Sequence, residues 1–438
     1  MKKVLIANRG EIAVRIIRAC HDLGLQTVAV YSEADSEAMH VHQADEAICI
    51  GEAASAKSYL KIPNLIAACE ITHADAVHPG YGFLSENANF ASICESSGLT
   101  FIGPSSKSIS LLGDKAQAKA TARSVKCPVI PGSEGIVHDV EQGLKEGRKF
   151  GYPLFIKAVA GGGGKGIRIA YSDKEFAQKF VAARTEASAS FNNPDVYLEK
   201  MIVNPRHVEV QVMGDKHGHY VYLAERDCTI QRRRQKLIEE APSPKVSDSL
   251  RKKMGECAVS IVKAAGYHSV GTVEFLLDEK GNFYFMEVNT RIQVEHTVTE
   301  ELTGIDLVKE QIRIAQGEKL SVRQKDIVLN GHVIEFRINA EDPSNQFAPS
   351  PGLLKDYIPS GGPHVRVDSA CYGGYKIPPN YDSMIAKLIV RGKTREEAIA
   401  HAQRALREFH ITGVHTTIPF HQYMLEDAKF LHHDYSIG

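Results

Sequence analysis

The sequence has almost no net charge and no long apolar run, and each absence argues against a class of partner. The 438-residue chain has 52 Lys and Arg residues against 53 Asp and Glu residues, so its formal net charge is -1. Without an overall basic field, nucleic acid is not an expected partner. No stretch approaches the roughly 18 apolar residues of a membrane span, and Met1-Lys2-Lys3 leads into a short strand rather than a signal-peptide core. We therefore expect a soluble, cytoplasmic protein with no membrane partner.

The sequence also lacks the spacings of metal or redox cysteines and two common nucleotide motifs. The two nearest of its eight cysteines, Cys49 and Cys69, lie twenty positions apart, so we expect small core residues rather than a zinc or redox site. The turn at Gly10 is not a Gly-x-Gly-x-x-Gly fingerprint, which argues against a nicotinamide or flavin cofactor. In the glycine-rich run 161–166, Lys165 is followed by glycine instead of Ser or Thr, so the run is not a Walker loop.

Short apolar strands alternate with a helical pattern in the first hundred residues. The pattern predicts a helix at 11–18 and strands at 4–7, 27–31, 76–78 and 99–102. This alternation is typical of an open parallel sheet in an α/β fold, with a ligand near the point where the strand order reverses. The length of the chain is sufficient for two or three domains with their own cores.

Residues 271–287 predict a β-hairpin that carries two carboxylates. With a two-residue turn at positions 280–281, Glu274 would face Glu287 directly across the hairpin. Two neighbouring carboxylates repel unless a cation lies between them. We therefore expect Glu274, Glu287 and Asn289 to bind Mg²⁺, whose preferred ligands are oxygens. The alternative is that both Glu side chains face water on an exposed sheet.

Polar residues continue at every second position after this hairpin. Glu287, Asn289, Arg291, Gln293 and Glu295 share one parity, and apolar residues take the positions between them. An extended chain over 283–296 would place all five polar side chains on one face. The pattern therefore predicts a row of reactive groups on one strand.

Four consecutive glycines lie between two predicted strands, 153–157 and 167–170. Glycines contribute no side chain to packing, so a lid whose backbone amides close over phosphate is the favoured interpretation of residues 161–166. A hairpin tip without function is the alternative. Lys157, on the preceding strand, is either a phosphate ligand or an ordinary surface lysine.

Three further motifs are weaker on their own. The turn-rich segment 78–87 is either a tight strand-to-helix connection or the wall of a pocket. The basic cluster 226–236 is either a solvated face or an anion site. His207 lies on a half-polar strand, where it is either a satisfied sheet residue or a ribose contact.

Taken together, these motifs resemble those of the biotin carboxylases, a group within the ATP-grasp family. The resemblance covers essentially the whole chain, and its motifs occur in the family's order at 7–12, 78–87, 157 with 161–166, 226–236 and 287–296. It implies a Rossmann-like N-terminal domain at 1–113, an ATP-grasp domain at 114–330 with a mobile lid at about 131–203, and a C-terminal biotin carboxylase domain at 331–438.

The resemblance also implies a role for each matching residue. ATP would be held by Lys115, Lys157, Gly162, Gly163, Gly164, Glu199, Lys200, His207, Gln231 and Arg234, and Mg²⁺ or Mn²⁺ by Glu274, Glu287 and Asn289. Bicarbonate would lie on Lys236, Arg291, Gln293 and the Val294 backbone, with Glu295 as the base that deprotonates it. Arg337 would stabilise the oxyanion of biotin, and the biotin entrance would be lined by Tyr81, Gly82 and Asp382.

The implied reaction is ATP-dependent carboxylation of biotin through carboxyphosphate, the first half-reaction of acetyl-CoA carboxylase in fatty acid synthesis. The expected partners are a biotin carboxyl carrier protein, carboxyltransferase subunits and a second copy in a homodimer. A biotin carboxylase component of a pyruvate or other acyl-CoA carboxylase, another ATP-grasp ligase and a non-catalytic nucleotide-binding regulator remain alternatives. Two residues depart from the family pattern: Arg234 replaces a usual histidine, and Thr297 replaces a usual proline, which we expect to loosen the chain after Glu295.

Overall fold

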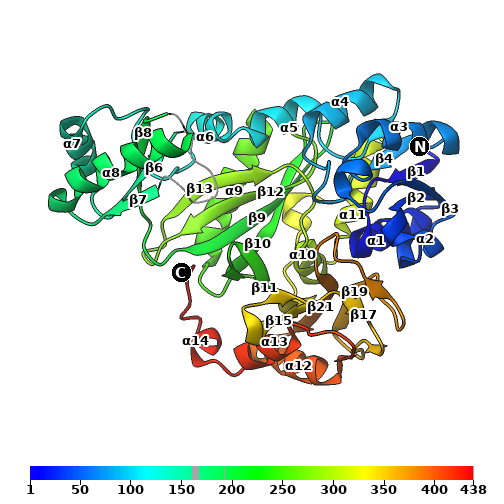
Figure 1. The fold of residues 1–438 in the computed structure, drawn as a ribbon. Helices are drawn as coiled ribbons and strands as arrows, with labels where there is room; N and C mark the ends of the chain where they lie inside the picture. Colours follow the sequence, from blue (N-terminus) through cyan, green and yellow to red (C-terminus); the bar gives the residue numbers. More distant parts are fainter. Residues whose placement is uncertain (160–166, 192, 438) are drawn as a thin grey trace. The chain divides into compact units, whose positions relative to one another are not determined.

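The computed structural model describes residues 1–159, 167–191 and 193–437 (Figure 1). Its residues form two compact units. The first holds Met1–Cys127, Arg206–Phe275 and Glu287–Gly438, and the second holds Pro128–Pro205 and Leu276–Met286. The predicted glycine-rich run, including Gly162, Gly163 and Gly164, lies outside the described residues.

The N-terminal part of the first unit is a five-stranded sheet in the order β3-β2-β1-β4-β5. Its neighbouring strands are all parallel, and β1 is buried on both faces because helices cover them. The strands are β1 (Lys3–Ile6), β2 (Gln26–Ser32), β3 (Glu46–Gly51), β4 (Ala76–His78) and β5 (Thr100–Phe101). The helices are α1 (Gly10–Asp22), α2 (Met39–Gln43), α3 (Ile62–Thr72), α4 (Ala88–Ser96), α5 (Ser106–Gly113) and α6 (Lys115–Ser124). The predicted open parallel sheet is confirmed.

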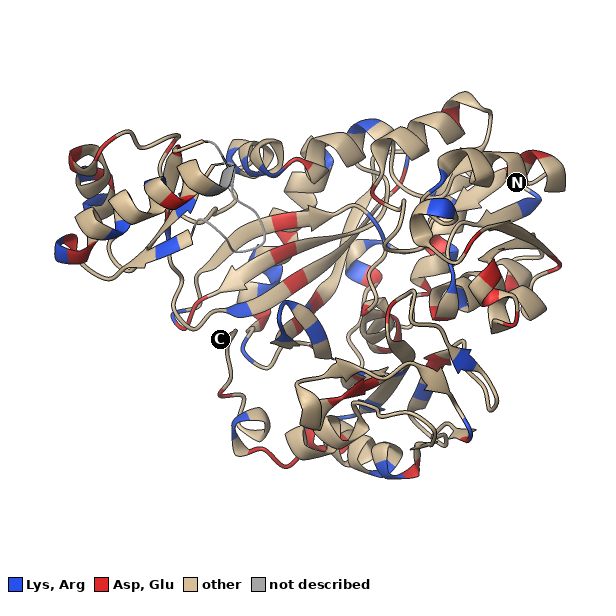
Figure 2. Ribbon diagram, in the orientation of Figure 1, with Lys and Arg blue, Asp and Glu red and all other residues tan. Residues whose placement is uncertain are grey.

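An eight-stranded sheet in the order β13-β12-β9-β10-β11-β14-β21-β19 continues the fold. The register is antiparallel along the run from β9 through β10, β11, β14 and β21 to β19. The strands are β9 (Arg206–Gly214), β10 (Tyr220–Arg232), β11 (Gln235–Ala241), β12 (Ser269–Leu277), β13 (Phe283–Asn289), β14 (His332–Asn339), β19 (Val365–Ser369) and β21 (Met384–Gly392). Charged residues are interleaved along its long strands (Figure 2).

Four longer helices accompany this sheet, and short elements occur in both parts of the first unit. The helices are α9 (Asp248–Ala264), α10 (His296–Thr303), α11 (Leu307–Ala315) and α12 (Arg395–Glu408), and α10 packs on β10, β11 and β14. The C-terminal core includes Phe336, Leu388 and Leu406. The short elements are η1 (Glu33–Asp35), η2 (Ser55–Lys57), η3 (Gln324–Asp326), η4 (Pro343–Asn345), β15 (Glu341–Asp342), β16 (Ala348–Pro349), β17 (Gly352–Leu353), β18 (Tyr357–Ile358), β20 (Lys376–Ile377), β22 (His410–Ile411), α13 (Ile418–Met424) and α14 (Ala428–Leu431).

The second unit is a small α/β layer of its own. A three-stranded antiparallel sheet in the order β7-β6-β8 packs against two helices around a core that includes Phe176 and Phe180. Its elements are α7 (Val140–Phe150), β6 (Leu154–Ala158), β7 (Ile167–Ala170), α8 (Asp173–Phe191) and β8 (Val196–Lys200). The strands that the sequence predicts on either side of the glycine run are therefore present as β6 and β7.

Two local predictions are wrong. The turn between β12 and β13 is longer than two residues, because the Asp278 amide donates to the Asn282 carbonyl (2.9 Å) and the Gly281 amide to the Asp278 carbonyl (3.1 Å). The register that set Glu274 directly opposite Glu287 therefore does not follow. The extended segment predicted over 283–296 ends at Asn289, and α10 begins at His296.

The cysteines also differ from expectation. Cys127 and Cys257 form a disulfide, although they are 130 positions apart and no spacing rule indicates a pair. Cys49 is exposed, whereas Cys20, Cys69, Cys94, Cys228 and Cys371 are buried as predicted. None of the helices in the described part of the chain combines the length and apolarity that a membrane crossing requires.

Candidate active site

The centre of the candidate site is Lys236, a largely buried cation on β11 that contacts three carboxylates. Its Nζ lies 2.6 Å from Glu209 Oε2, 2.5 Å from Glu295 Oε1 and 3.4 Å from Glu274 Oε1. These partners come from β9, from β12 and from the turn before α10. Burial alone would lower the pKa of Lys236, but the surrounding anions raise it well above its usual value. The lysine is therefore a fixed positive charge.

Glu295 is shared between two cations. Besides Lys236, Arg337 on β14 contacts it, with Nη2 3.0 Å from Glu295 Oε2. Burial would raise the pKa of Glu295, but Lys236, Arg337 and Arg226 together hold it well below its usual range. The Glu295 carboxylate is therefore ionised, which is the state in which it can accept a proton.

Arg337 also contacts a carboxylate that the sequence analysis did not single out. Its Nε donates to Glu239 Oε1 on β11 at 2.6 Å. Arg337 therefore forms ion pairs both with Glu239 on the neighbouring strand β11 and with Glu295.

Arg226 is a second residue whose role the sequence did not indicate. It is fully buried, and its guanidinium donates to Glu209 (2.6 Å) and Gln293 (2.8 Å). Further bonds reach Gln211, Thr272 and Thr299. Gln293 in turn donates to Glu274 at 3.0 Å. Arg226 is therefore bonded directly to Glu209 on β9 and, through Gln293, to Glu274 on β12. The basic cluster 226–236 is therefore not one surface, since it begins at a buried arginine.

The far end of that cluster lies in a turn. Arg233 and Arg234 both have left-handed backbone conformations and are exposed between β10 and β11. Gln231 donates to the Cys228 carbonyl at 3.3 Å. Among the basic residues of the cluster, Arg226 and Lys236 alone reach the buried carboxylates in the contacts that the described residues show.

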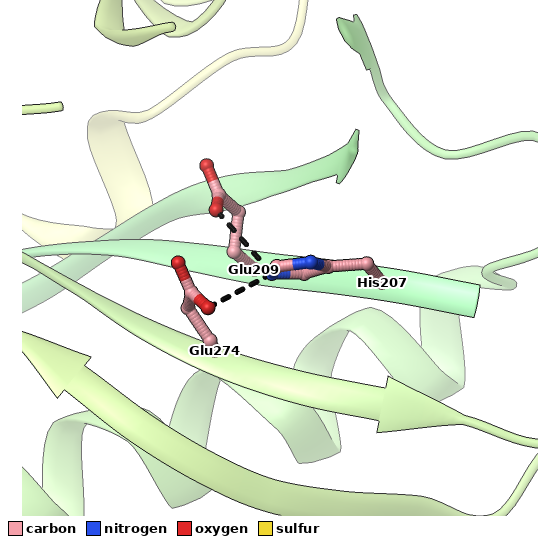
Figure 3. Close-up of side chains that lie close together, drawn as sticks. All are labelled: His207, Glu209 and Glu274. Atoms are coloured by element: carbon pink, nitrogen blue, oxygen red, sulfur yellow. Dashed lines mark ion pairs between the residues drawn. The ribbon is translucent and has the colours of Figure 1, made fainter. Parts of the chain in front are cut away.

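His207, Glu209 and Glu274 form a tight group on β9 and β12 (Figure 3). His207 Nε2 lies 2.9 Å from Glu274 Oε2 and 3.9 Å from Glu209 Oε2. Although burial lowers it, the pKa of His207 is raised by the bond to Glu274. The pKa of Glu274, which burial would raise, is held low by Lys236 and His207. The predicted strand is confirmed as β9, and all nine of its residues are buried, the polar ones included.

The predicted metal ligands are only partly assembled. Asn289 donates its side-chain amide to Glu274 Oε1 at 2.9 Å, while its Oδ1 accepts from Arg291 at 3.1 Å. Glu287 is half-exposed and lies 3.7 Å from Lys115. Two carboxylates and an amide oxygen are hard ligands of the kind that Mg²⁺ prefers, so these residues fit that ion.

A cavity of about 550 Å³ adjoins the carboxylate cluster. Its lining includes residues predicted for bicarbonate and for biotin, which the sequence separates by up to three hundred positions: Tyr81, Gly82, Arg291, Val294, Arg337 and Asp382. Tyr81 donates its hydroxyl to the buried carboxylate of Glu11. Arg291 pairs with Glu86 at 2.8 Å. The turn-rich segment 78–87 is therefore a pocket wall.

The remaining predicted ATP residues lie within the second unit. Lys157 on β6 and Glu199 on β8 form an ion pair. Lys200 donates to the carbonyls of Gly151 (2.8 Å) and Tyr152 (2.7 Å), so its ammonium is bonded to backbone. Burial lowers the pKa of Lys200. The Lys157 side chain is 22% exposed in its pair with Glu199.

Thr297 does not loosen the chain after Glu295. It is fully buried in the first turn of α10, and its hydroxyl donates to Glu335. Lys387, also fully buried, donates to the Val294 carbonyl at 3.0 Å and so fixes the backbone just before Glu295.

Comparison with known families matches the chain along its length. The model described as "Biotin carboxylase, N-terminal domain" matches residues 1–109, "Carbamoyl-phosphate synthase L chain, ATP binding domain" matches 114–323, and "Biotin carboxylase C-terminal domain" matches 335–438.

Individual proteins agree with these matches. A biotin carboxylase of a Nostoc species is 57% identical over 429 residues, which cover 98% of this chain and 96% of that one. The biotin carboxylase domain of Hydrogenobacter thermophilus 2-oxoglutarate carboxylase, solved as a dimer with MgADP, ADP and bicarbonate, has a TM-score of 0.89 at 50% identity, covering 100% of this chain and 96% of that one. The biotin carboxylase subunit of a pyruvate carboxylase has a TM-score of 0.92 at 49% identity and covers 100% and 96%.

Proposed function

The chain belongs to the biotin carboxylase family, and on that premise we propose that it carboxylates biotin with bicarbonate at the expense of ATP. The observation that carries the proposal is the arrangement of Glu295. This carboxylate is buried, held ionised by Lys236 and Arg337, and placed beside a cavity lined by Arg291 and Arg337.

Bicarbonate is a poor electrophile, so the reaction needs its activation by phosphoryl transfer. Glu295 takes the proton of bicarbonate, and the resulting oxygen attacks the γ-phosphate of ATP to give ADP and carboxyphosphate. Lys236 and Arg291 supply fixed positive charge to the anion in this step. Glu274, Glu287 and Asn289 would hold Mg²⁺, which offsets the charge of the phosphates when bound.

Carboxyphosphate then breaks down to CO₂ and phosphate inside the closed site. The released phosphate removes the proton from the ureido nitrogen of biotin, and the nitrogen attacks CO₂. Arg337 stabilises the enolate-like oxygen that develops on biotin, because its guanidinium is always charged and donates in a fixed fork. Tyr81, Gly82 and Asp382, which line the same cavity, would border the path by which biotin enters.

ATP would be bound by residues that lie far apart in the sequence. We assign this role to Lys115, Lys157, Gly162, Gly163, Gly164, Glu199, Lys200, His207, Gln231 and Arg234. The domain division at 1–113, 114–330 and 331–438 belongs to the same proposal. It is supported by family matches that break at similar places.

The carboxylated biotin would be carried on a biotin carboxyl carrier protein and passed to carboxyltransferase subunits. We place the chain in the first half-reaction of acetyl-CoA carboxylase, in the cytoplasm, and expect it to work as a homodimer, as the H. thermophilus domain is a dimer. A second candidate is the biotin carboxylase component of another carboxylase. It is supported by the similarity to domains of 2-oxoglutarate and pyruvate carboxylases at 49–50% identity.

The test is ADP release by the purified chain with and without bicarbonate and free biotin. The proposal predicts a rate that requires bicarbonate and rises further with biotin. ADP release that ignores bicarbonate would instead indicate a different ATP-grasp enzyme, and no ADP release would indicate a regulator.

A further inference from the structure

Two buried carboxylates next to Arg337 have no role in the reaction described above. Glu239 on β11 and Glu335 on β14 are both fully buried. The register of the two antiparallel strands pairs Glu239 directly with Glu335. Residues that are directly opposite in such a pair project to the same face of the sheet, with Cβ atoms about 5 Å apart. The two carboxyl groups are therefore immediate neighbours.

Each of these carboxyl groups has one oxygen that is bonded and one that is not. Glu239 Oε1 accepts from Arg337 Nε at 2.6 Å, and Glu335 Oε2 accepts from the Thr297 hydroxyl. Among the residues that the structure describes, Glu239 Oε2 and Glu335 Oε1 have no hydrogen-bond partner. Two buried carboxylates at paired positions of neighbouring strands repel when both are ionised, and each unpartnered oxygen also lacks the hydrogen bonds that water would give it.

We propose that Glu239 and Glu335 hold one proton between them, bonded to one of the two unpartnered oxygens and donated to the other. A single proton gives both oxygens a partner and leaves the pair with one negative charge. When two carboxylates share a buried site, ionisation of one strongly disfavours ionisation of the other, and a shared proton relieves this repulsion. Glu335 is then a positioning residue, because it acts on Arg337 through Glu239.

The charged groups that face Glu239 and Glu335 agree with one negative charge on the pair. Arg337 and Lys236 face Glu239, and Lys387 faces Glu335 from β21, while Glu295 adds a further negative charge. Lys387 is itself paired with Glu11 at 3.2 Å and Arg337 with Glu295 at 3.0 Å, so neither cation is available to neutralise a second charge on the pair. Burial raises the pKa of Glu239 to about 7 and raises that of Glu335 well above its usual value.

The shared proton keeps the Arg337 guanidinium where it donates to Glu239 and to Glu295 at once. When the pair loses its proton, a second negative charge appears on the face of β14 that carries Arg337, and Arg337 is drawn away from Glu295. The catalytic consequence rests on the proposed role of Arg337 toward biotin, whereas the presence of the proton does not.

The first test is infrared spectroscopy of the whole protein at neutral pH. The difference spectrum between wild type and Glu335→Gln should contain the C=O stretching band of a protonated carboxylic acid, and Glu239→Gln should lose the same band. The matched control is Glu240→Gln. Glu240 is the next residue on β11, is equally buried, and has its carboxylate bonded to Arg395 and His332. This control should lose no such band.

The absence of a protonated band from both difference spectra would overturn the proposal, whatever reaction the chain catalyses. Two variants are used so that the test stands if one of them does not fold. The second test is the pH profile of biotin-dependent ADP release. In the wild type we expect the rate to fall at alkaline pH. Glu335→Gln should not show this fall, because the introduced amide donates to Glu239 at every pH. The same fall in both proteins would contradict the positioning role.

Discussion

Replacing Glu295 by Gln tests the proposed base directly. The amide keeps the size of the side chain and can still accept from Lys236 or Arg337, but it cannot take a proton from bicarbonate. Loss of a positioned general base typically lowers a rate by about 10²- to 10⁴-fold, which corresponds to about 3–5 kcal/mol of activation free energy. We expect kcat for bicarbonate-dependent ADP release to fall by that factor. The KM for ATP should change less than about three-fold, since the contacts of Glu295 among the described residues are with Lys236 and Arg337, neither of which is proposed to bind ATP.

The matched control is Glu225→Gln, because Glu225 is also buried and also paired with an arginine, Arg251, but does not line the cavity. Its kcat should stay within about two-fold of wild type. Both variants are checked by circular dichroism and thermal unfolding, so that a loss of fold is not mistaken for a loss of chemistry. A Glu295→Gln protein that is folded and retains more than about a tenth of the wild-type kcat would refute the assignment of Glu295 as the base.

Three further predictions follow from the same contacts. Arg226→Met should lower the free energy of unfolding by about 3–5 kcal/mol, because it leaves the buried Glu209 without its guanidinium partner. A urea-unfolding midpoint equal to that of the wild type would contradict the structural role of Arg226. Arg337→Lys should reduce biotin carboxylation at least tenfold while reducing bicarbonate-dependent ADP release less, because a lysine cannot donate in a fork to two groups; equal losses in both assays would argue against a role toward biotin. Glu240→Gln should destabilise the protein more at neutral pH than in acid. Burial alone would raise the pKa of Glu240, but His332 and Arg395 hold it well below its usual value. The ionised carboxylate therefore stabilises the folded protein above about pH 4.3, the pKa of a glutamate in the unfolded chain. This stabilisation is lost progressively as the pH falls below that value. Thermal unfolding of both proteins from pH 7 to pH 3 should show the difference shrinking, and a constant difference would contradict it.

The elements with strong patterns could be predicted from the sequence. The apolar run at 4–7 and the later apolar segments of the first hundred residues predict the parallel sheet, because strands buried on both faces are continuous apolar segments in the sequence. The motif order gave the family, and most predicted site residues of the first unit do lie around one cavity and one carboxylate cluster.

The connections between charged residues could not be predicted in the same way. Arg226, Glu239 and Glu335 lie in stretches that look like solvated or half-polar strands. Their burial depends on neighbouring strands that the local pattern does not specify. The row of polar residues from Glu287 to Glu295 has the period of a strand, but the strand itself ends at Asn289, and the chain then turns toward α10. The period alone does not show where a strand ends. It also does not fix the register of a hairpin, as the turn between β12 and β13 shows.

The most direct measurement of the central claim is the transfer of labelled bicarbonate to free biotin by the purified chain with ATP and Mg²⁺. We expect labelled carboxybiotin to form only when ATP and bicarbonate are both present, and to form about 10²- to 10⁴-fold more slowly in the Glu295→Gln reaction. ATP cleavage without any label on biotin, or labelling of biotin by Glu295→Gln at the wild-type rate, would contradict it.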